Sequence, residues 1–94
     1  MLTIRRLIWD AWNVAHIARH QVIPEEVEEV CHGQPVASQT YKGRLRVVGP
    51  THRHRMLTVI LAPTDEAGVY YAVTARPADR KERRSYEQQQ RGRT

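Results

Sequence analysis

The sequence predicts an α+β fold with a helical hairpin, a four-stranded antiparallel meander and a C-terminal helix. Apolar residues recur at helical spacing before Gly33, and from Pro35 onward the period changes to two. Loops between the later segments are so short that neighbouring strands are expected to pair antiparallel. The chain of 94 residues is expected to form one domain over residues 1–90, with a disordered tail at 91–94.

The N-terminal segment predicts a strand and then a first helix. Residues 2–9 are β-prone and alternate imperfectly, so a short strand is expected there, whether or not it joins the main sheet. Asp10 can accept hydrogen bonds from the free N–H groups of the first helical turn, which makes it a good N-cap. Helical spacing predicts a buried face of Ala11, Val14, Ala15, Ala18 and Val22, and a neighbouring polar face of Asn13, His16 and His20.

A second helix is expected to begin at Pro24, where the missing N–H costs nothing. Glu25 and Glu26 suit the positive end of the helix dipole, and Gly33 suits its C-terminal end. The apolar stripe of this helix is expected to contain Ile23, Val27 and Val30.

Four strands and a closing helix complete the expected fold. The strands are expected at Val36 to Tyr41, Leu45 to Pro50, Met56 to Pro63 and Val69 to Arg76. Alternation places Leu45, Val47 and Gly49 on one face and Arg44, Arg46 and Val48 on the other. In the fourth strand it places Tyr70, Ala72, Thr74 and Arg76 together. Asp79 is expected to cap a final basic helix that reaches Gln90.

The charge distribution points to an acidic partner. Fifteen Lys and Arg against ten Asp and Glu give a net charge of +5. Residues 25–29 contain four Glu, whereas the C-terminal part is rich in Arg, whose planar guanidinium matches phosphate oxygens. A nucleic acid or an acidic protein is therefore expected as a partner, and a plain solubilising surface is the alternative.

Cysteine and hydropathy bound the location. The single cysteine, Cys31, excludes an internal disulfide and fits a reducing cytosol. No apolar run approaches the ~18 residues of a membrane span, and MLTIRRLIWD lacks a signal-peptide core. We therefore expect a cytoplasmic protein with no membrane partner.

Several kinds of catalytic site find little support. Two histidine pairs, His16-x3-His20 and His52-x-His54, lack the third and fourth ligands that zinc requires, and the second pair lies in an Arg-rich turn. Cys31 lies near a helix C-terminus, where the dipole raises the pKa of a thiol. No Gly-rich phosphate loop is present. We expect no metal and no cofactor.

Metal-independent RNA cleavage remains compatible with the composition. It requires a base for the 2′-hydroxyl, cations for the phosphorane-like transition state and an acid for the leaving oxygen. The candidate cations are Arg44, Arg46, Arg53, Arg55 and Arg76. The candidate proton carriers are His16, His20, His52, His54 and Tyr86. Many small basic domains contain such residues, so composition alone does not separate a nuclease from a binding protein.

Four short motifs resemble one known family. They are Trp9-Asp10 before the first helix, Arg19-His20 with Val22 at its end, the Pro-Glu-Glu-Val start of the second helix, and TARPADRKERRSYE from Thr74 to Glu87. In this combination the chain resembles the BrnT toxins of type II toxin–antitoxin systems, small ribonucleases with a RelE-like fold. The family usually has Lys three residues after the Trp-Asp pair and Gly after the His, where this chain has Asn13 and Gln21, as in a divergent branch.

The resemblance implies an endoribonuclease that inhibits translation and is neutralised by a ribbon-helix-helix antitoxin. The implied catalytic candidates are His20, Arg46, Arg76 and Tyr86. The implied RNA-binding candidates are Trp9, His16, Arg44, Arg53, Arg55, Arg80 and Arg83. The alternative function, motivated by Asn13 and Gln21, is a catalytically inactive binding module that kept the toxin fold.

Some of these residues also have structural alternatives. Trp9 can fill the seam between helices and sheet, and Tyr86 can belong to the core. Arg76 can form an ion pair with Glu82 or Glu87. The two histidines of the first helix can be ordinary polar residues of a helix face.

Overall fold

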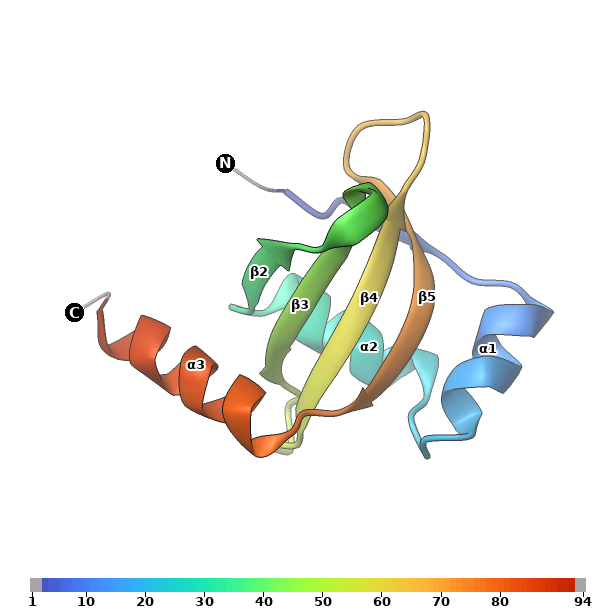
Figure 1. Ribbon diagram of the computed structural model, residues 1–94. Helices are drawn as coiled ribbons and strands as arrows, with labels where there is room; N and C mark the ends of the chain where they lie inside the picture. Colours follow the sequence, from blue (N-terminus) through green and yellow to red (C-terminus); the bar gives the residue numbers. More distant parts are fainter. Residues whose placement is uncertain (1–2, 93–94) are drawn as a thin grey trace.

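The computed structural model describes residues 3–92, which form an α+β fold with three α-helices and a five-stranded mixed sheet (Figure 1). The elements in chain order are β1 (Arg6–Ile8), α1 (Ala11–Ala18), α2 (Pro24–His32), β2 (Val36–Gln39), the 3₁₀ turn η1 (Tyr41–Gly43), β3 (Leu45–Pro50), β4 (Met56–Pro63), β5 (Val69–Pro77) and α3 (Arg80–Arg91). The strand order in the sheet is β1-β5-β4-β3-β2.

The expected antiparallel meander is present as β2 to β5, but it is not the whole sheet. β1 pairs in parallel with β5, so the sheet has five strands and is mixed. The backbone N–H groups of Arg5 and Arg6 donate to the carbonyl of Gly68 at 2.7 and 3.2 Å and start this pairing. Gly68 has a φ of 82°, and a Cβ there would lie 2.8 Å from the side chain of Arg5. Glycine is therefore needed where β1 meets β5.

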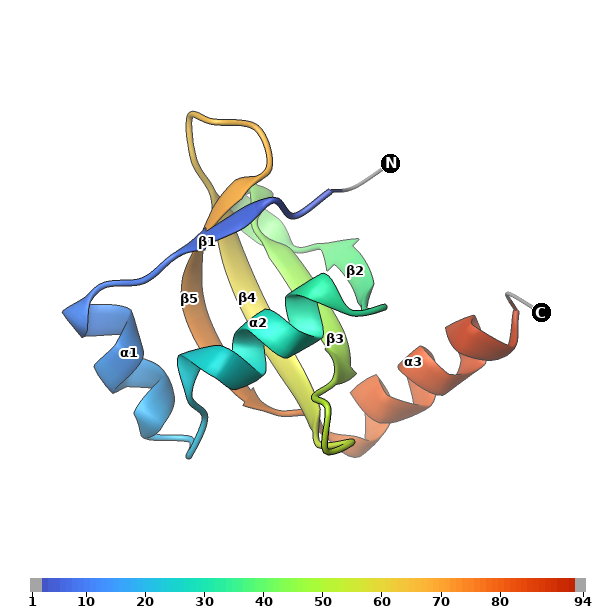
Figure 2. The ribbon, with the colours of Figure 1, turned by 180° about the vertical axis from the view of Figure 1, so that it is seen from behind.

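The core lies between the sheet and one helical layer. Figure 2 shows α2 crossing one face of the sheet and α1 beside β5, with a short corner joining the two helices as expected for a helical hairpin. The helical layer contributes Ile17, Val22, Val27 and Val30, and the sheet contributes Leu7, Leu45, Val47, Leu57, Val59 and Leu61. Trp9 is partly buried and packs against this cluster.

The buried face of α1 differs from the expected one. Asn13 and Ile17 are fully buried, whereas Ala11, Val14, Ala15 and Ala18 are exposed; only Val22 of the expected set is in the core. The amide of Asn13 donates to the carbonyls of Ile8 at 2.9 Å and Ala72 at 3.1 Å. These contacts rotate the helix so that an amide, rather than a small apolar side chain, faces the sheet. Ile23, expected in the stripe of α2, is likewise 54% exposed.

The capping predictions are confirmed at both ends of the chain. The Asp10 carboxylate accepts from the N–H of Asn13 at 2.9 Å, and the Asn13 side chain accepts in return from the N–H of Asp10 at 2.8 Å. Asp79 and Glu82 form the same reciprocal pair at the start of α3. Both arrangements are capping boxes, which satisfy N–H groups that the helix leaves free.

A β-bulge overturns the expected alternation in β5. The register pairs Ile60 with Thr74 but Leu61 with Ala72, so β5 carries one extra residue at this point. Because a bulge shifts the alternation by one position, Ala72 and Ala75 both face the core. Ala72 and Arg76 therefore do not share a face as strict alternation predicts.

The third helix lies away from the other two, beside the β2–β3 end of the sheet (Figures 1 and 2). It continues through Arg91 with Gly92 after it, whereas the disordered tail was expected to begin at Arg91; residues 93–94 lie outside the described part. Among residues 3–92 there is no helix with the length and hydrophobicity needed to cross a bilayer.

Candidate functional site

A groove of about 490 Å³ separates α3 from β2 and β3. Its floor contains Val36 and Val48, which are register partners, and Ser38 and Arg46, which are the next pair on the same face. The alternation expected for β3 is thus confirmed, because Leu45 and Val47 face the core while Arg46 faces the groove.

One side of α3 forms the opposite wall of the groove. Lys81, Ser85 and Gln89 are spaced four residues apart and therefore lie on one face of the helix, beside Glu82 and Tyr86. Lys81, Ser85 and Gln89 were not among the residues expected at a site. Their i, i+4 spacing places them on the same side of the helix as Tyr86, but in a polar helix the sequence does not indicate which side faces the sheet.

The groove contains unbalanced positive charge. Within residues 3–92, neither Arg46 nor Lys81 has a carboxylate within ion-pair distance, although both line the groove. The groove's one acidic lining residue in this part of the chain, Glu82, is already paired. The two cations are therefore available for an anionic ligand, and a phosphate group suits a guanidinium and an ammonium together.

Arg76 has the structural partner that was considered for it. Its guanidinium donates to both carboxylate oxygens of Glu82 at 2.9 Å, and Thr58 and the N–H of Asp79 add bonds of 2.8 and 3.0 Å. Hydrogen bonding by Arg76 is the main reason that the pKa of Glu82 falls to about 2. Glu82 in turn raises the pKa of Arg76. Arg76 therefore orients the start of α3, and its charge is balanced inside the molecule.

Tyr86 secures the far part of the same helix. Its hydroxyl donates to the carbonyl of Gln34 at 3.2 Å, and the Gln90 amide donates to that carbonyl at 3.4 Å. The ring is half-buried and lines the groove rather than joining the core beneath α1 and α2. Tyr86 thus lies beside Arg46 and Lys81, as a groove residue with a polar tip.

The structure does not bring His20 to this groove. His20 follows α1, which packs on β5 and on the helix-covered face, whereas Arg46 lies two strands away on the opposite face. His16 lies on the outer side of α1 near His20, with ring centroids 6.4 Å apart. Trp9 donates its indole N–H to Glu28 at 2.8 Å and so ties the entry of α1 to α2. The expected site is therefore divided between two sides of the molecule.

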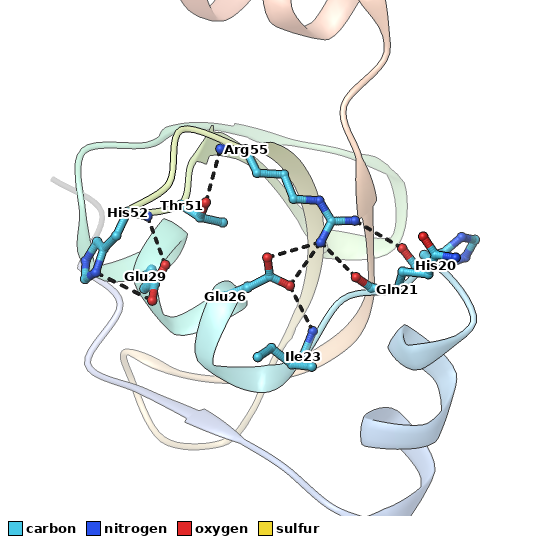
Figure 3. Close-up of polar contacts among 8 residues, drawn as sticks. All are labelled: His20, Gln21, Ile23, Glu26, Glu29, Thr51, His52 and Arg55. Carbon is cyan, nitrogen blue, oxygen red and sulfur yellow. Dashed lines mark hydrogen bonds and ion pairs between the residues drawn. The ribbon is translucent and has the colours of Figure 1, made fainter.

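Arg55 is a structural residue. Its guanidinium donates to both oxygens of Glu26, at 3.0 and 3.1 Å, and to the carbonyls of Gln21 at 2.8 Å and His20 at 3.3 Å (Figure 3). These bonds attach the turn before β4 to the α1–α2 corner. Arg55 was expected to bind RNA, whereas in the structure its charge is balanced by Glu26 and both of its Nη atoms hydrogen-bond within the protein.

Nearby, the turn makes a second attachment to α2. The N–H of His52 donates to Glu29 at 2.9 Å, and the His52 ring lies 3.5 Å from the same carboxylate (Figure 3). Arg53 is exposed at the tip of this turn, away from the groove lining.

The other basic candidates lie at the margins. Arg44 is half-buried just before β3. Arg80 and Arg83 are exposed and, with Arg84 and Glu87, line a separate shallow hollow of about 270 Å³ on α3. They extend the basic surface of α3 but do not line the groove.

The geometry does not favour nucleophilic catalysis by the cysteine or a histidine–carboxylate metal centre among the described residues. Burial, with a contribution from Glu28, raises the pKa of the Cys31 thiol to about 12, so this thiol is a poor nucleophile. Within residues 3–92, no three His, Cys, Asp or Glu side chains come together as a metal site.

Comparison with known proteins adds no family assignment. The chain matches no profile of a known protein family, and no curated protein sequence matches it.

Proposed function

We propose that this protein binds RNA in the groove between α3 and the sheet and cleaves it without a metal, as a BrnT-like toxin neutralised by a ribbon-helix-helix antitoxin. The observation that carries the proposal is the pair of unbalanced cations, Arg46 and Lys81, beside the hydroxyl groups of Ser85 and Tyr86. RNA offers the phosphates that such a groove suits.

The proposed chemistry assigns roles only to residues that line the groove. The 2′-hydroxyl attacks the adjacent phosphorus, and the bond to the 5′-oxygen of the next nucleotide breaks. Arg46 and Lys81 stabilise the additional negative charge of the phosphorane-like transition state. The 2′-hydroxyl gives its proton to solvent water as it attacks, the Tyr86 hydroxyl gives its proton to the leaving oxygen, and the phenolate regains a proton from solvent. His20 and Arg76 have no direct role in this scheme.

Two departures from the family pattern are compatible with the proposed relationship. Gln21, where BrnT toxins usually have Gly, has a φ of 61°, in the left-handed region that favours glycine. Asn13, where the family usually has Lys, completes a capping box and ties α1 to two strands. The first retains the backbone shape that a glycine would supply, and the second places a buried amide where the family usually has Lys.

A cleavage assay tests the proposal directly. Purified protein is incubated with a long single-stranded RNA, with and without EDTA, and the products are separated by size. We expect cleavage that EDTA does not reduce and that Arg46→Gln lowers by about 100-fold or more, as for loss of a transition-state cation. Arg6→Gln, which removes one exposed charge from β1, is the matched control and should retain activity. Absence of cleavage by wild type, or its abolition by EDTA, refutes the mechanism.

A second candidate function is a binding module without catalysis. It is favoured by the Arg76–Glu82 pair, which removes one expected catalytic charge, and by the position of His20 outside the groove. RNA binding that weakens steeply with salt, accompanied by no cleavage, would support this function over the first.

A further inference from the structure

An aromatic stack on the outer side of α1 is not used by the fold or by the groove. The rings of Trp12 and His16 lie parallel within 8°, with centroids 4.8 Å apart, and Trp12 is 58% exposed. They line a hollow of about 240 Å³ together with Ala15 and Arg19. Of the two tryptophans, Trp9 is partly buried and hydrogen-bonded, whereas Trp12 presents its ring to solvent.

The electrostatic surroundings of this stack favour an anion. Arg19 is the one lining residue of the hollow with a permanent charge, and no Asp or Glu lines it among the described residues. In the part of the chain that the structure describes, Arg19 forms no ion pair. A flat aromatic surface beside an unpaired guanidinium matches the two halves of a nucleotide, because a base stacks on the rings and its phosphate meets the cation.

We infer that the Trp12–His16 stack is a subsite for an unpaired base of single-stranded RNA, with Arg19 contacting the adjoining phosphate. The subsite rests on the proposed function in that RNA is the ligand, but it requires no cleavage. It lies on α1, outside the groove, so it supplies affinity for the strand rather than a group for the reaction. Because every base has a π-face, this subsite holds bases without selecting among them.

Two substitutions at one exposed position separate stacking from simple apolar contact. Trp12→Phe keeps an aromatic face, whereas Trp12→Leu keeps an apolar side chain and removes the face. Position 12 is exposed on α1 and belongs to no part of the core, so both variants are expected to fold, as circular dichroism checks. Two probes complete the design: a short 2′-O-methyl oligouridine that cannot be cleaved, and a backbone of the same length without bases.

We expect Trp12→Leu to weaken oligouridine binding about tenfold, as for loss of one stacked base, and Trp12→Phe to weaken it much less. Binding of the abasic backbone should be equal for wild type and both variants, because it has phosphates but nothing to stack. Fluorescence anisotropy with a labelled probe measures all three proteins.

The other outcomes overturn the inference in distinguishable ways. If Trp12→Leu binds oligouridine as wild type does, the subsite is absent, while the effect of Arg46→Gln on cleavage still decides the groove. If Trp12→Leu weakens both probes equally, position 12 affects binding without stacking a base. If wild type binds neither probe, the subsite and the proposed RNA function both fail. If wild type binds as expected but cleaves nothing, the subsite stands and only the nuclease proposal falls.

Discussion

Replacing Asn13 by Ala should strongly destabilise the protein, although position 13 carries a polar side chain. Asn13 is fully buried and its side chain takes part in three hydrogen bonds, with the carbonyls of Ile8 and Ala72 and with the N–H of Asp10. Ile8 and Tyr71 are the last paired residues of β1 and β5, so the amide covers the point where the two strands separate. In the Asn13→Ala variant, the buried carbonyl of Ala72 loses the donor that Asn13 supplies.

The size of the effect follows from the number of bonds. Each hydrogen bond contributes about 0.5–1.5 kcal/mol net, and a buried group left unpaired costs about 1–3 kcal/mol. Losing all three bonds should therefore lower the free energy of unfolding by about 3 kcal/mol. For a small domain with a total stability of about 5–15 kcal/mol, that is a large fraction.

Urea unfolding followed by circular dichroism measures this difference. Val14→Ala, an exposed position one residue further along the same helix, is the matched control and should change stability by less than about 0.5 kcal/mol. Asn13→Asp keeps the acceptor for the Asp10 N–H but replaces the amide donors, so it should be at least as destabilising as Ala. A loss below about 1 kcal/mol for Asn13→Ala, with cooperative unfolding, would refute the assignment of Asn13 as the link between α1 and the sheet.

Two further predictions concern the ion pairs. The pKa of Glu82 is about 2 in the folded protein, below its unfolded value of 4.5, so its stabilising effect is full above pH 4.5 and is lost as pH falls toward 2. Glu82→Gln should remove about 2–3 kcal/mol at pH 7 and little near pH 2, as urea midpoints across pH measure; a difference independent of pH would contradict this. Arg55→Met should lower the free energy of unfolding by about 1–2 kcal/mol, because Glu26 and two backbone carbonyls lose their donor. RNA affinity, measured under conditions in which the variant is fully folded, should stay unchanged. A fall in RNA affinity with unchanged stability would restore Arg55 to the binding surface.

The antiparallel part of the sheet was predictable because its signals are local. The observed bounds of β3 and β4 equal the expected ones, and η1 forms at Lys42 and Gly43, where both residues have positive φ. Turn residues and period-two patterns act over a few positions, so one sequence reveals them. The joining of β1 to β5 was not predictable from such signals. Only three residues pair, and their partners lie about 60 positions away.

The buried face of α1 could not be obtained from hydrophobic spacing. An amide at position 13 reads as polar surface, because the carbonyls that satisfy it belong to β1 and to a bulged strand far along the chain. Alternation in β5 failed for a related reason, since the extra residue of a bulge leaves no mark in the composition of the strand. Both errors come from tertiary contacts that override a local period.

The same dependence on tertiary contacts explains why the arginines expected at the site have such different environments in the structure. Composition makes Arg46, Arg55 and Arg76 equivalent, but the fold gives each a different environment. Arg76 meets a carboxylate six residues away across a strand–helix junction, and Arg55 meets one 29 residues away in another element. Arg46 has no such partner among the described residues, because it lies on the sheet face that α3 only partly covers. Whether an arginine is free to bind a ligand therefore depends on where the acidic residues lie in the fold. For this reason the proposed chemistry is assigned to one groove rather than to a set of arginines.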